Sequence, residues 1–326
     1  MASVAVNQAP GSPSRARRWL SGFRKRETWI AYLFLLPWFF GFLALTAGPM
    51  VASAYLSLTN YGVEQIAGFE PTKVVGLDHY HELLHDPKIT LALKNTLIFT
   101  VMLVPAKMLV ALGLAMLLLR VSRKLAGVFR TIFYLPEMAP KVAVGVLVLT
   151  LFNGQEGIVN RGLEAIGIQG PFWTTDPNWI KPSLVIMTVW ACGGTMVIYL
   201  AALAGVPQHL YEAAAIDGAS AWRRFRDITL PMISPALFFT FIILTIAGFQ
   251  TFDEAFTAFF GAGSTGAEDP DAALFYSIYL FRQAFRFFDM GYAAAMAWLL
   301  FAIIMAVTLV QILVSRRLVF YQGGQR

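Results

Sequence analysis

Three ionisable side chains lie inside strongly apolar segments of the chain. Lys107 falls in the middle of one segment, and Glu137 and Lys141 fall near the start of the next, four residues apart. Ionisable groups in an apolar medium are costly and usually pair or serve a function. The spacing of Glu137 and Lys141 puts both on one helical face. We therefore predict an internal ion pair among these three residues. It either locks two segments together or contacts a solute, and the lock is the simpler interpretation.

A second polar cluster lies in the stretch "GFQTFDEAFTAFF", residues 248–260. Gln250 and Asp253 are three residues apart, so a helix places them on one face, with phenylalanines between them. Amide and carboxylate groups bind hydroxyls, and aromatic rings pack against the C–H side of a sugar. This mixture is the one that contact with a sugar needs. The alternative is that Asp253 and Glu254 simply meet the lipid headgroups where a helix leaves the membrane, and the sequence leaves both open.

Another pair of candidate solute contacts follows two glycines. Thr195 and Tyr199 are four residues apart and share a helical face, directly after Gly193 and Gly194. Paired glycines let helices approach closely. The two hydroxyls either face the same solute path or pack between helices, and packing is the simpler interpretation.

The sequence contains no arrangement typical of catalysis. Cys192 is the single cysteine, so an intrachain disulfide is excluded, and the Cys/His spacings of a metal site are missing. No G-x-x-x-x-G-K-[ST] segment occurs, so the chain lacks a phosphate-cradling loop. We predict no catalytic residue, no metal and no cofactor on this chain.

Composition indicates a bilayer as solvent. Apolar residues make up 57% of the 326 residues and charged residues only 13%, against about a quarter charged in soluble domains. A membrane-spanning helix needs about 20 apolar residues, and the chain offers six such segments. We predict an all-α integral membrane fold with six transmembrane helices, at roughly 29–56, 91–119, 128–152, 182–206, 235–258 and 290–314. Pro136 and Pro140 predict a kink or break in the third.

The distribution of lysine and arginine predicts the orientation. Sixteen of the 25 Lys and Arg residues lie in the two termini, the link after the second segment and the loop 207–234, and six lie in the other loops. Cytoplasmic loops carry the positive excess. We therefore expect a basic cytoplasmic tail (1–28), a transmembrane domain (29–314) and a cytoplasmic tail (315–326). The net charge of +6 marks this topology and contact with lipid, not nucleic acid.

The loop "YEAAAIDGASAWRRFRDITLP", residues 211–231, is polar although apolar segments flank it. Pro207 suits a first helical turn, Gly218 suits a left-handed stop, and Ser220 suits the N-cap of a second short helix. On that helix Trp222 and Phe225 share a face with Thr229, and Pro231 is expected to end it. This predicts a helix-turn-helix with an aromatic and arginine surface, the composition that protein interfaces favour. The alternatives are a solvated loop and an aromatic anchor in the lipid interface.

The same loop carries the pattern E-A-A-x-x-x-G, nine residues, then I-x-L-P, without departure: Glu212, Ala213, Ala214, Gly218, Ile228, Leu230 and Pro231. This resembles the signature loop of permease subunits of binding-protein-dependent ABC importers. "LLPWFFGF", "GPMVASAYLSLTNY" and "FRTIFYLPEMAP" are similar to the carbohydrate-uptake class of that family, the maltose and glycerol-phosphate type. The resemblance covers residues 29 to about 320.

The resemblance implies a coupling helix between spans four and five that docks on a cytoplasmic ATPase. The implied contact residues are Glu212, Ala213, Ala214, Gly218, Ala219, Ser220 and Phe225, and residue type adds Trp222 and Arg223. It further implies alternating access, ATP and Mg on two ATPase subunits, a second homologous permease, an external solute-binding protein and a prokaryotic inner membrane. The other hypotheses are an ion-coupled secondary transporter, which the intramembrane charges favour, and a membrane enzyme, which has the least support.

Overall fold

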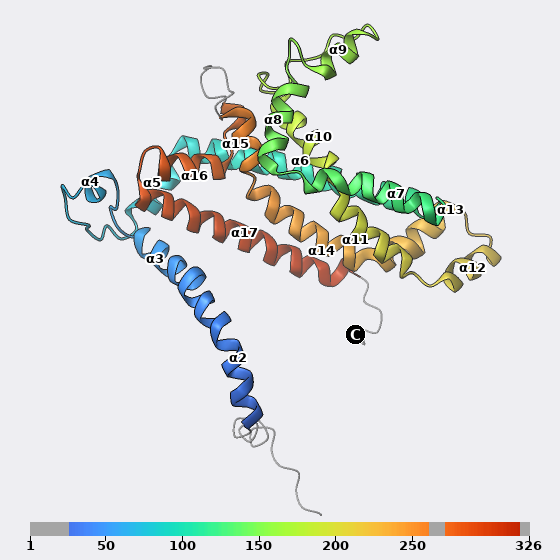
Figure 1. Ribbon diagram of the computed structural model, residues 1–326, viewed down its shortest axis with the longest axis horizontal. Coiled ribbons are helices and arrows are strands. Elements are labelled where there is room, and N and C mark those ends of the chain that lie inside the picture. Colours follow the sequence, from blue (N-terminus) through green and yellow to red (C-terminus); the bar gives the residue numbers. More distant parts are fainter. Residues whose placement is uncertain (1–25, 261–270, 320–326) are drawn as a thin grey trace, which may run out of the picture. The chain divides into compact units, whose positions relative to one another are not determined.

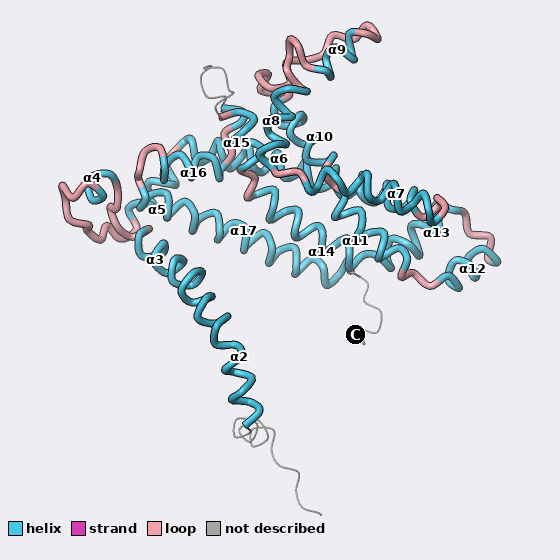
Figure 2. The backbone as a smooth tube through the Cα atoms, viewed as in Figure 1, coloured by secondary structure: helices cyan, strands magenta, loops and turns pink. Residues whose placement is uncertain are grey.

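The computed structural model describes residues 26–260 and 271–319, so most of the two predicted tails lies outside the described residues. Within these ranges the regular elements are all helical, as Figure 2 shows, and strand-like pairing is limited to one bridge between Thr59 and Val74. The predicted all-α fold is confirmed for this part of the chain. The chain divides into two compact units, residues 1–56 and 57–326.

The described part of the first unit, residues 26–56, is one long apolar helix. It consists of α2 (Arg26–Phe42), a π-helical turn (Leu43–Ala47) and α3 (Gly48–Leu56). Its stretch Trp29–Leu56 is 28 residues long with no charged side chain, which is long enough to cross a bilayer. Nothing within the unit buries these side chains, because a single helix has no second layer to cover it.

The second unit is organised around a helix of 32 residues, α6 (Pro87–Leu118). Two short helices precede it, α4 (Val63–Ile66) and α5 (Asp78–His85). Asp86 caps α6 by accepting a hydrogen bond from the Lys88 N–H at 2.8 Å. The same carboxylate accepts hydrogen bonds from Tyr279 Oη at 2.7 Å and Tyr292 Oη at 2.9 Å. These residues belong to α16 (Tyr276–Phe285) and α17 (Met290–Leu318), so Asp86 fixes three helices at one end.

The third and fourth predicted spans are both broken helices. The third consists of α7 (Arg123–Tyr134), a 3-10 turn (Leu135–Met138) and α8 (Lys141–Leu151), with a bend of 94°. The predicted break at Pro136 and Pro140 is confirmed. The fourth consists of α10 (Ile180–Trp190) and α11 (Gly193–Ala204), bent by 52°, and this break was not predicted. Between the two spans α9 (Ile158–Glu164) lies beyond the ends of α8 and α10 (Figure 1).

The remaining helices complete the unit. They are α12 (Gln208–Ile216), α13 (Ala221–Arg224), a π-helical turn (Phe225–Thr229), α14 (Leu230–Phe249), α15 (Asp253–Phe259) and a 3-10 turn (Asp271–Ala273). One apolar cluster joins the first half of α6 to α8, α10, α15, α16 and α17. A second cluster joins the last turns of α6 to α11 and the start of α14. Lys107 lies on α6 between the two clusters.

The number of crossings depends on the broken helices. In the described residues four helices are long and apolar enough to span a membrane, and the count rises to six when each bent pair is one span. The four are Trp29–Leu56, Pro87–Leu118, Ala221–Phe259 and Met290–Ser315. Six therefore remains our prediction, while several membrane crossings are established by the length and composition of these helices.

Candidate functional site

The predicted turn of the polar loop is formed by Gly218. This residue has φ +73°, the left-handed conformation that glycine adopts without a steric penalty. The Gly218 N–H donates to the Ala215 carbonyl at 3.1 Å, and the Ala219 N–H donates to the Ala214 carbonyl at 2.9 Å. These two bonds satisfy the last carbonyls of α12 in the usual glycine-terminated pattern. The predicted stop at Gly218 is confirmed.

The second helix of the loop begins as predicted but does not end as predicted. Ser220 Oγ accepts a hydrogen bond from the Arg223 N–H at 3.3 Å, so it is the N-cap. Pro231, however, does not end the element, because the helix continues through the π-helical turn into α14. In that turn the Leu230 N–H donates to the Phe225 carbonyl, one residue further back than in an α-helix. Further along, Pro235 cannot donate to the Pro231 carbonyl, and Ser234 Oγ donates to it instead, at 2.7 Å.

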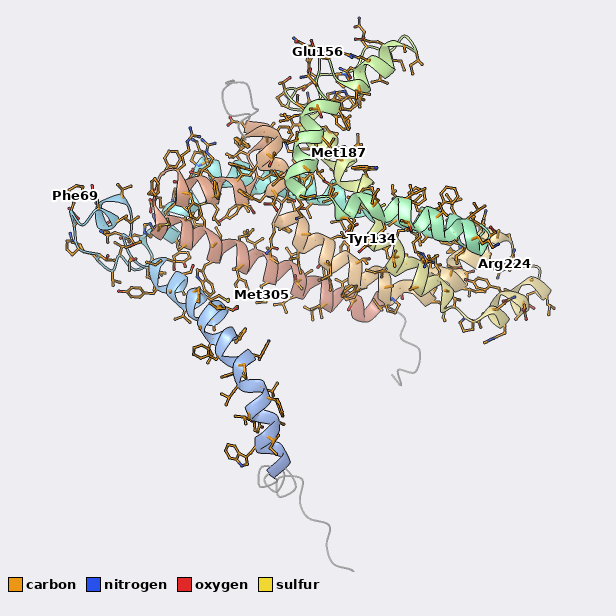
Figure 3. The ribbon with its side chains drawn as sticks, viewed as in Figure 1. Phe69, Tyr134, Glu156, Met187, Arg224 and Met305 are labelled. Atoms are coloured by element: carbon orange, nitrogen blue, oxygen red, sulfur yellow. The ribbon has the colours of Figure 1, made fainter. Side chains whose placement is uncertain are left out.

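The loop presents an exposed apolar and basic surface. Ile216 is 86% exposed and Trp222 is 69% exposed. The Trp222 ring lies 5.6 Å from the half-buried Phe225 ring, which packs on the cluster of α6 and α11. Asp227 pairs with Arg226 at 2.7 Å and with Arg223 at 3.6 Å. Figure 3 shows Arg224 at the end of the unit that carries α13, away from Tyr134 at the end of α7.

The remaining predicted loop residues lie on α12 and at its end. Glu212 and Ala213 are exposed, whereas Ala214 and Ala219 are partly buried. Tyr211 Oη and Thr229 Oγ1 are hydrogen-bonded at 2.9 Å, so α12 is tied to the π-helical turn. The two arms of the loop are therefore fixed to each other, and the loop is attached to the membrane helices at Phe225 and Thr229.

The three intramembrane charges do not form the predicted ion pair. Within the described residues the ion pairs shorter than 4.0 Å lie elsewhere, and none joins Lys107, Glu137 and Lys141. Glu137 Oε2 instead accepts a hydrogen bond from the Gly194 N–H at 3.0 Å. The prediction was wrong because it assumed a continuous fourth span. The break before Gly193 creates a helix start with unpaired N–H groups, which attract a carboxylate.

The fifth span does not form the continuous helical face that was predicted to contact a sugar. Gln250 ends α14 and Asp253 begins α15, and the residues between them are not helical, so the three-residue spacing does not define a face. Both side chains are exposed. Glu254 is buried, and its Oε2 has no hydrogen-bond partner. The alternative that Glu254 meets the lipid headgroups does not fit this burial, which follows from the packing of α15 on α8.

The two hydroxyl residues of the fourth span lie inside the protein. Tyr199 is fully buried, and its Oη is hydrogen-bonded to Thr240 Oγ1 on α14 at 2.6 Å. Thr195 is 7% exposed. Both side chains fit the packing interpretation, which is the simpler of the two that the sequence offers, and a role in a solute path stays a prediction.

Several apolar helices, two bent helix pairs and a capped polar loop between α11 and α14 are the architecture of a multi-pass membrane protein. Residues 107–320 match the family model of the binding-protein-dependent transport system inner membrane component. The chain belongs to this family, and it is a transport permease subunit.

Similar proteins cover nearly the whole chain. A probable ABC transporter permease protein of Bacillus subtilis, YesP, is 36% identical over 92% of this chain and 95% of its own length. The lactose transport system permease protein LacF of Rhizobium radiobacter is 36% identical over 82% of this chain and 88% of its own. The solved bacterial ABC transporter that imports the acidic polysaccharide alginate contains a chain that superposes with a TM-score of 0.76. That chain is 27% identical, with 92% of this chain and 99% of its own covered.

Proposed function

We propose that this chain is the permease subunit of an ATP-driven importer that moves a sugar or sugar-like solute into the cell by alternating access. The observation that carries the proposal is the loop at Gly218, which is fixed internally yet exposes Ile216 and Trp222. Buried aromatic and arginine residues dominate the energetics of protein interfaces. A loop that holds such residues exposed to solvent is suited to bind a protein partner. We assign this role to a cytoplasmic ATPase.

The sugar class rests on the relatives. One relative named above is a lactose permease, and others transport arabinooligosaccharides and sulfoquinovosyl glycerol. Gln250 and Asp253 remain our candidates for solute hydroxyls, since both are exposed at the break between α14 and α15. The Lys107, Glu137 and Lys141 region is a second candidate, because polar groups at broken helices line paths in transporters.

The proposed assembly contains more than this chain. It comprises a second homologous permease, two copies of an ATPase that hold ATP and Mg, and an external solute-binding protein. One solved relative was determined as a complex with an alginate pentasaccharide-bound periplasmic protein, and its permease chain is 26% identical to this one. The chain itself would carry no cofactor.

The test is recovery of partner proteins with the tagged chain from its native membrane. Trp222→Ala and Ile216→Ala are each expected to weaken ATPase binding by about 30-fold, because truncating a side chain at the centre of an interface costs about 2 kcal/mol of binding free energy. Ile166→Ala is the matched control, because Ile166 is 70% exposed but follows α9. The proposal fails if the parent chain purifies without an ATPase and moves solute under an ion gradient.

A further inference from the structure

The breaks in the third and fourth spans meet at one point, which we call the junction: residues 133–138 and 191–194. A Cβ added to Gly193 would lie 2.5 Å from the Phe133 carbonyl oxygen and 2.5 Å from Tyr134 Cα. Only glycine allows the start of α11 to approach the end of α7 so closely. The free N–H groups of the first turn of α11 therefore face the 3-10 turn that carries Glu137.

Glu137 caps this helix start through one hydrogen bond, and its side chain is not packed in the protein interior. Its Oε2 accepts the Gly194 N–H at 3.0 Å, and its Oε1 would lie 3.2 Å from a Cβ at Gly194. A carboxylate at a helix N-terminus is favourable. The Glu137 side chain is nevertheless exposed on this chain, so no packing holds it there. The contact can be broken without disturbing either apolar cluster.

Lys107 is a largely buried charged residue of α6. It is 9% exposed, and among the described residues it has neither an ion pair nor a hydrogen bond. The ammonium nitrogen is not among the fully buried atoms, so a carboxylate that moves toward it can reach it. Met187 of α10 packs in the cluster of the first half of α6, and Cys192, the N-cap of α11, packs in the cluster of its last turns, so the break between α10 and α11 lies at the level of Lys107. Glu137, which is bound to the start of α11, is therefore a carboxylate at the level of Lys107.

The helix that Glu137 caps is also the one that leads to the polar loop. α11 packs along α6 and ends at Ala204, four residues before α12 begins. It is an unbroken helix of 12 residues. A pull on the loop is thus transmitted along α11 to its start, where the Glu137 contact lies.

We propose that Glu137 is a positioning residue for transport that exchanges partners. In the state described here its carboxylate caps α11, and in the opposite state, after α11 has moved with the loop, it pairs with the Lys107 ammonium. The inference rests on the proposed function, since that function supplies the motion of the loop. The exchange gives the Glu137 carboxylate one favourable partner in each state, the α11 start in one and Lys107 in the other.

The test uses Cys192, the only cysteine of the chain, as a built-in reporter of the junction. The complex is labelled with N-ethylmaleimide, without nucleotide and after trapping with Mg-ATP and vanadate, and the labelled Cys192 peptide is quantified. We expect the labelling rate of the parent to differ between the two conditions, because movement of α11 uncovers a thiol that is 2% exposed here.

The substitutions distinguish exchange from a static cap. Glu137→Gln keeps an acceptor for the Gly194 N–H but loses the ion pair, and Lys107→Met removes the other partner. Each is expected to reduce the nucleotide-dependent change by about tenfold, and the double variant no further, because both remove one interaction. Lys141→Met is the matched control, since Lys141 is exposed at the start of α8, four residues beyond Glu137 in the chain, and it should behave like the parent.

The charge-exchanged double variant, Lys107→Glu with Glu137→Lys, is expected to favour the trapped state even without nucleotide. A lysine at the start of α11 is unfavourable, whereas the ion pair is restored, so Cys192 without nucleotide should label like the trapped parent. The inference is overturned if the effects of the two single variants multiply in the double variant, if the parent shows no change, or if the exchanged pair resembles the single variants. If the parent complex contains no ATPase, the proposed function itself has failed. If the exchanged pair does not assemble, the two single variants and the double variant still decide.

Discussion

Gly218 fixes the direction in which the chain leaves α12, and its conformation explains why the position needs glycine. With φ +73° and no atom near a built Cβ, an alanine would meet backbone strain and no clash. The expected cost of Gly218→Ala is about 1 kcal/mol. We expect this strain to lower the temperature at which the ATPase separates from the permease.

The matched control for this prediction is Gly205→Ala. Gly205 has φ −80°, and a Cβ there would lie 3.4 Å from the nearest atom, an ordinary contact. Equal effects of the two substitutions would show that the left-handed turn does not position the loop.

At the scale of single residues, the sequence predicts those features that depend on residues nearby in the chain. The stop at Gly218 and the N-cap at Ser220 are formed by bonds to residues three to five positions away, so spacing alone identified them. Tyr199 bonds to Thr240, 41 residues away, and spacing cannot show such a partner. The same holds for Glu254, which is buried by α8.

At the scale of elements, the junction depends on close backbone approach at Gly193. We expect Gly193→Ala to destabilise the solubilised chain by about 1–3 kcal/mol, the usual cost of overpacking. The cost can exceed this range, because the atoms that a Cβ would meet belong to the backbone of α7 and cannot move aside as a side chain can. Gly113→Ala in the interior of α6 has open space around its Cβ and should stabilise by about 0.5–1 kcal/mol. Thermal aggregation of the two variants measures this difference, and equal behaviour would refute the contact.

A second prediction concerns Asp86, which joins α6, α16 and α17. Burial raises the pKa of this carboxyl, but hydrogen bonds from Tyr279, the Lys88 N–H and Tyr292 outweigh it, so its pKa lies below 3.8. Burial and the bond to Asp86 raise the pKa of Tyr279. Since the folded-state pKa of Asp86 is depressed, its contribution to stability is complete above 3.8 and is lost as the pH falls through the folded value.

Thermal unfolding measured from pH 6 to pH 2 checks this contribution. We expect Asp86→Asn to lower stability at pH 6 and to lessen the loss on acidification, and Tyr279→Phe to show part of the same effect. An acid dependence identical to that of the parent in both variants would mean that the carboxylate does not join the helices.

Prolines predicted some helix breaks and not others. Pro136 and Pro140 do break the third span, whereas Pro231 and Pro235 lie in continuing helix because the π-helical turn and Ser234 compensate for the missing N–H groups. The fourth span breaks without a proline, at Ala191 and Cys192. There the cause is tertiary, since Glu137 stabilises a helix start that the local sequence does not require.

At the scale of the whole molecule, the side of the membrane on which α9 lies depends on how the bent pairs cross. The chain enters the third span after Leu118, at the inner end of α6 by the charge rule. If both bent pairs are spans, α9 lies outside and the polar loop inside. If both pairs are re-entrant, α9 and the loop lie on the same side, and the chain crosses four times.

Cysteine labelling in intact cells decides between these arrangements. In a Cys192→Ala background, Glu164→Cys on α9 and Trp222→Cys in the loop each place one thiol at an exposed position. A maleimide that cannot cross the membrane should label Glu164→Cys from outside, and Trp222→Cys only after the membrane is opened. Protection of both sites would establish re-entrant helices and four spans, because α9 would then share the inner side. Labelling of Trp222→Cys from outside would reverse the orientation and remove the loop from any cytoplasmic ATPase.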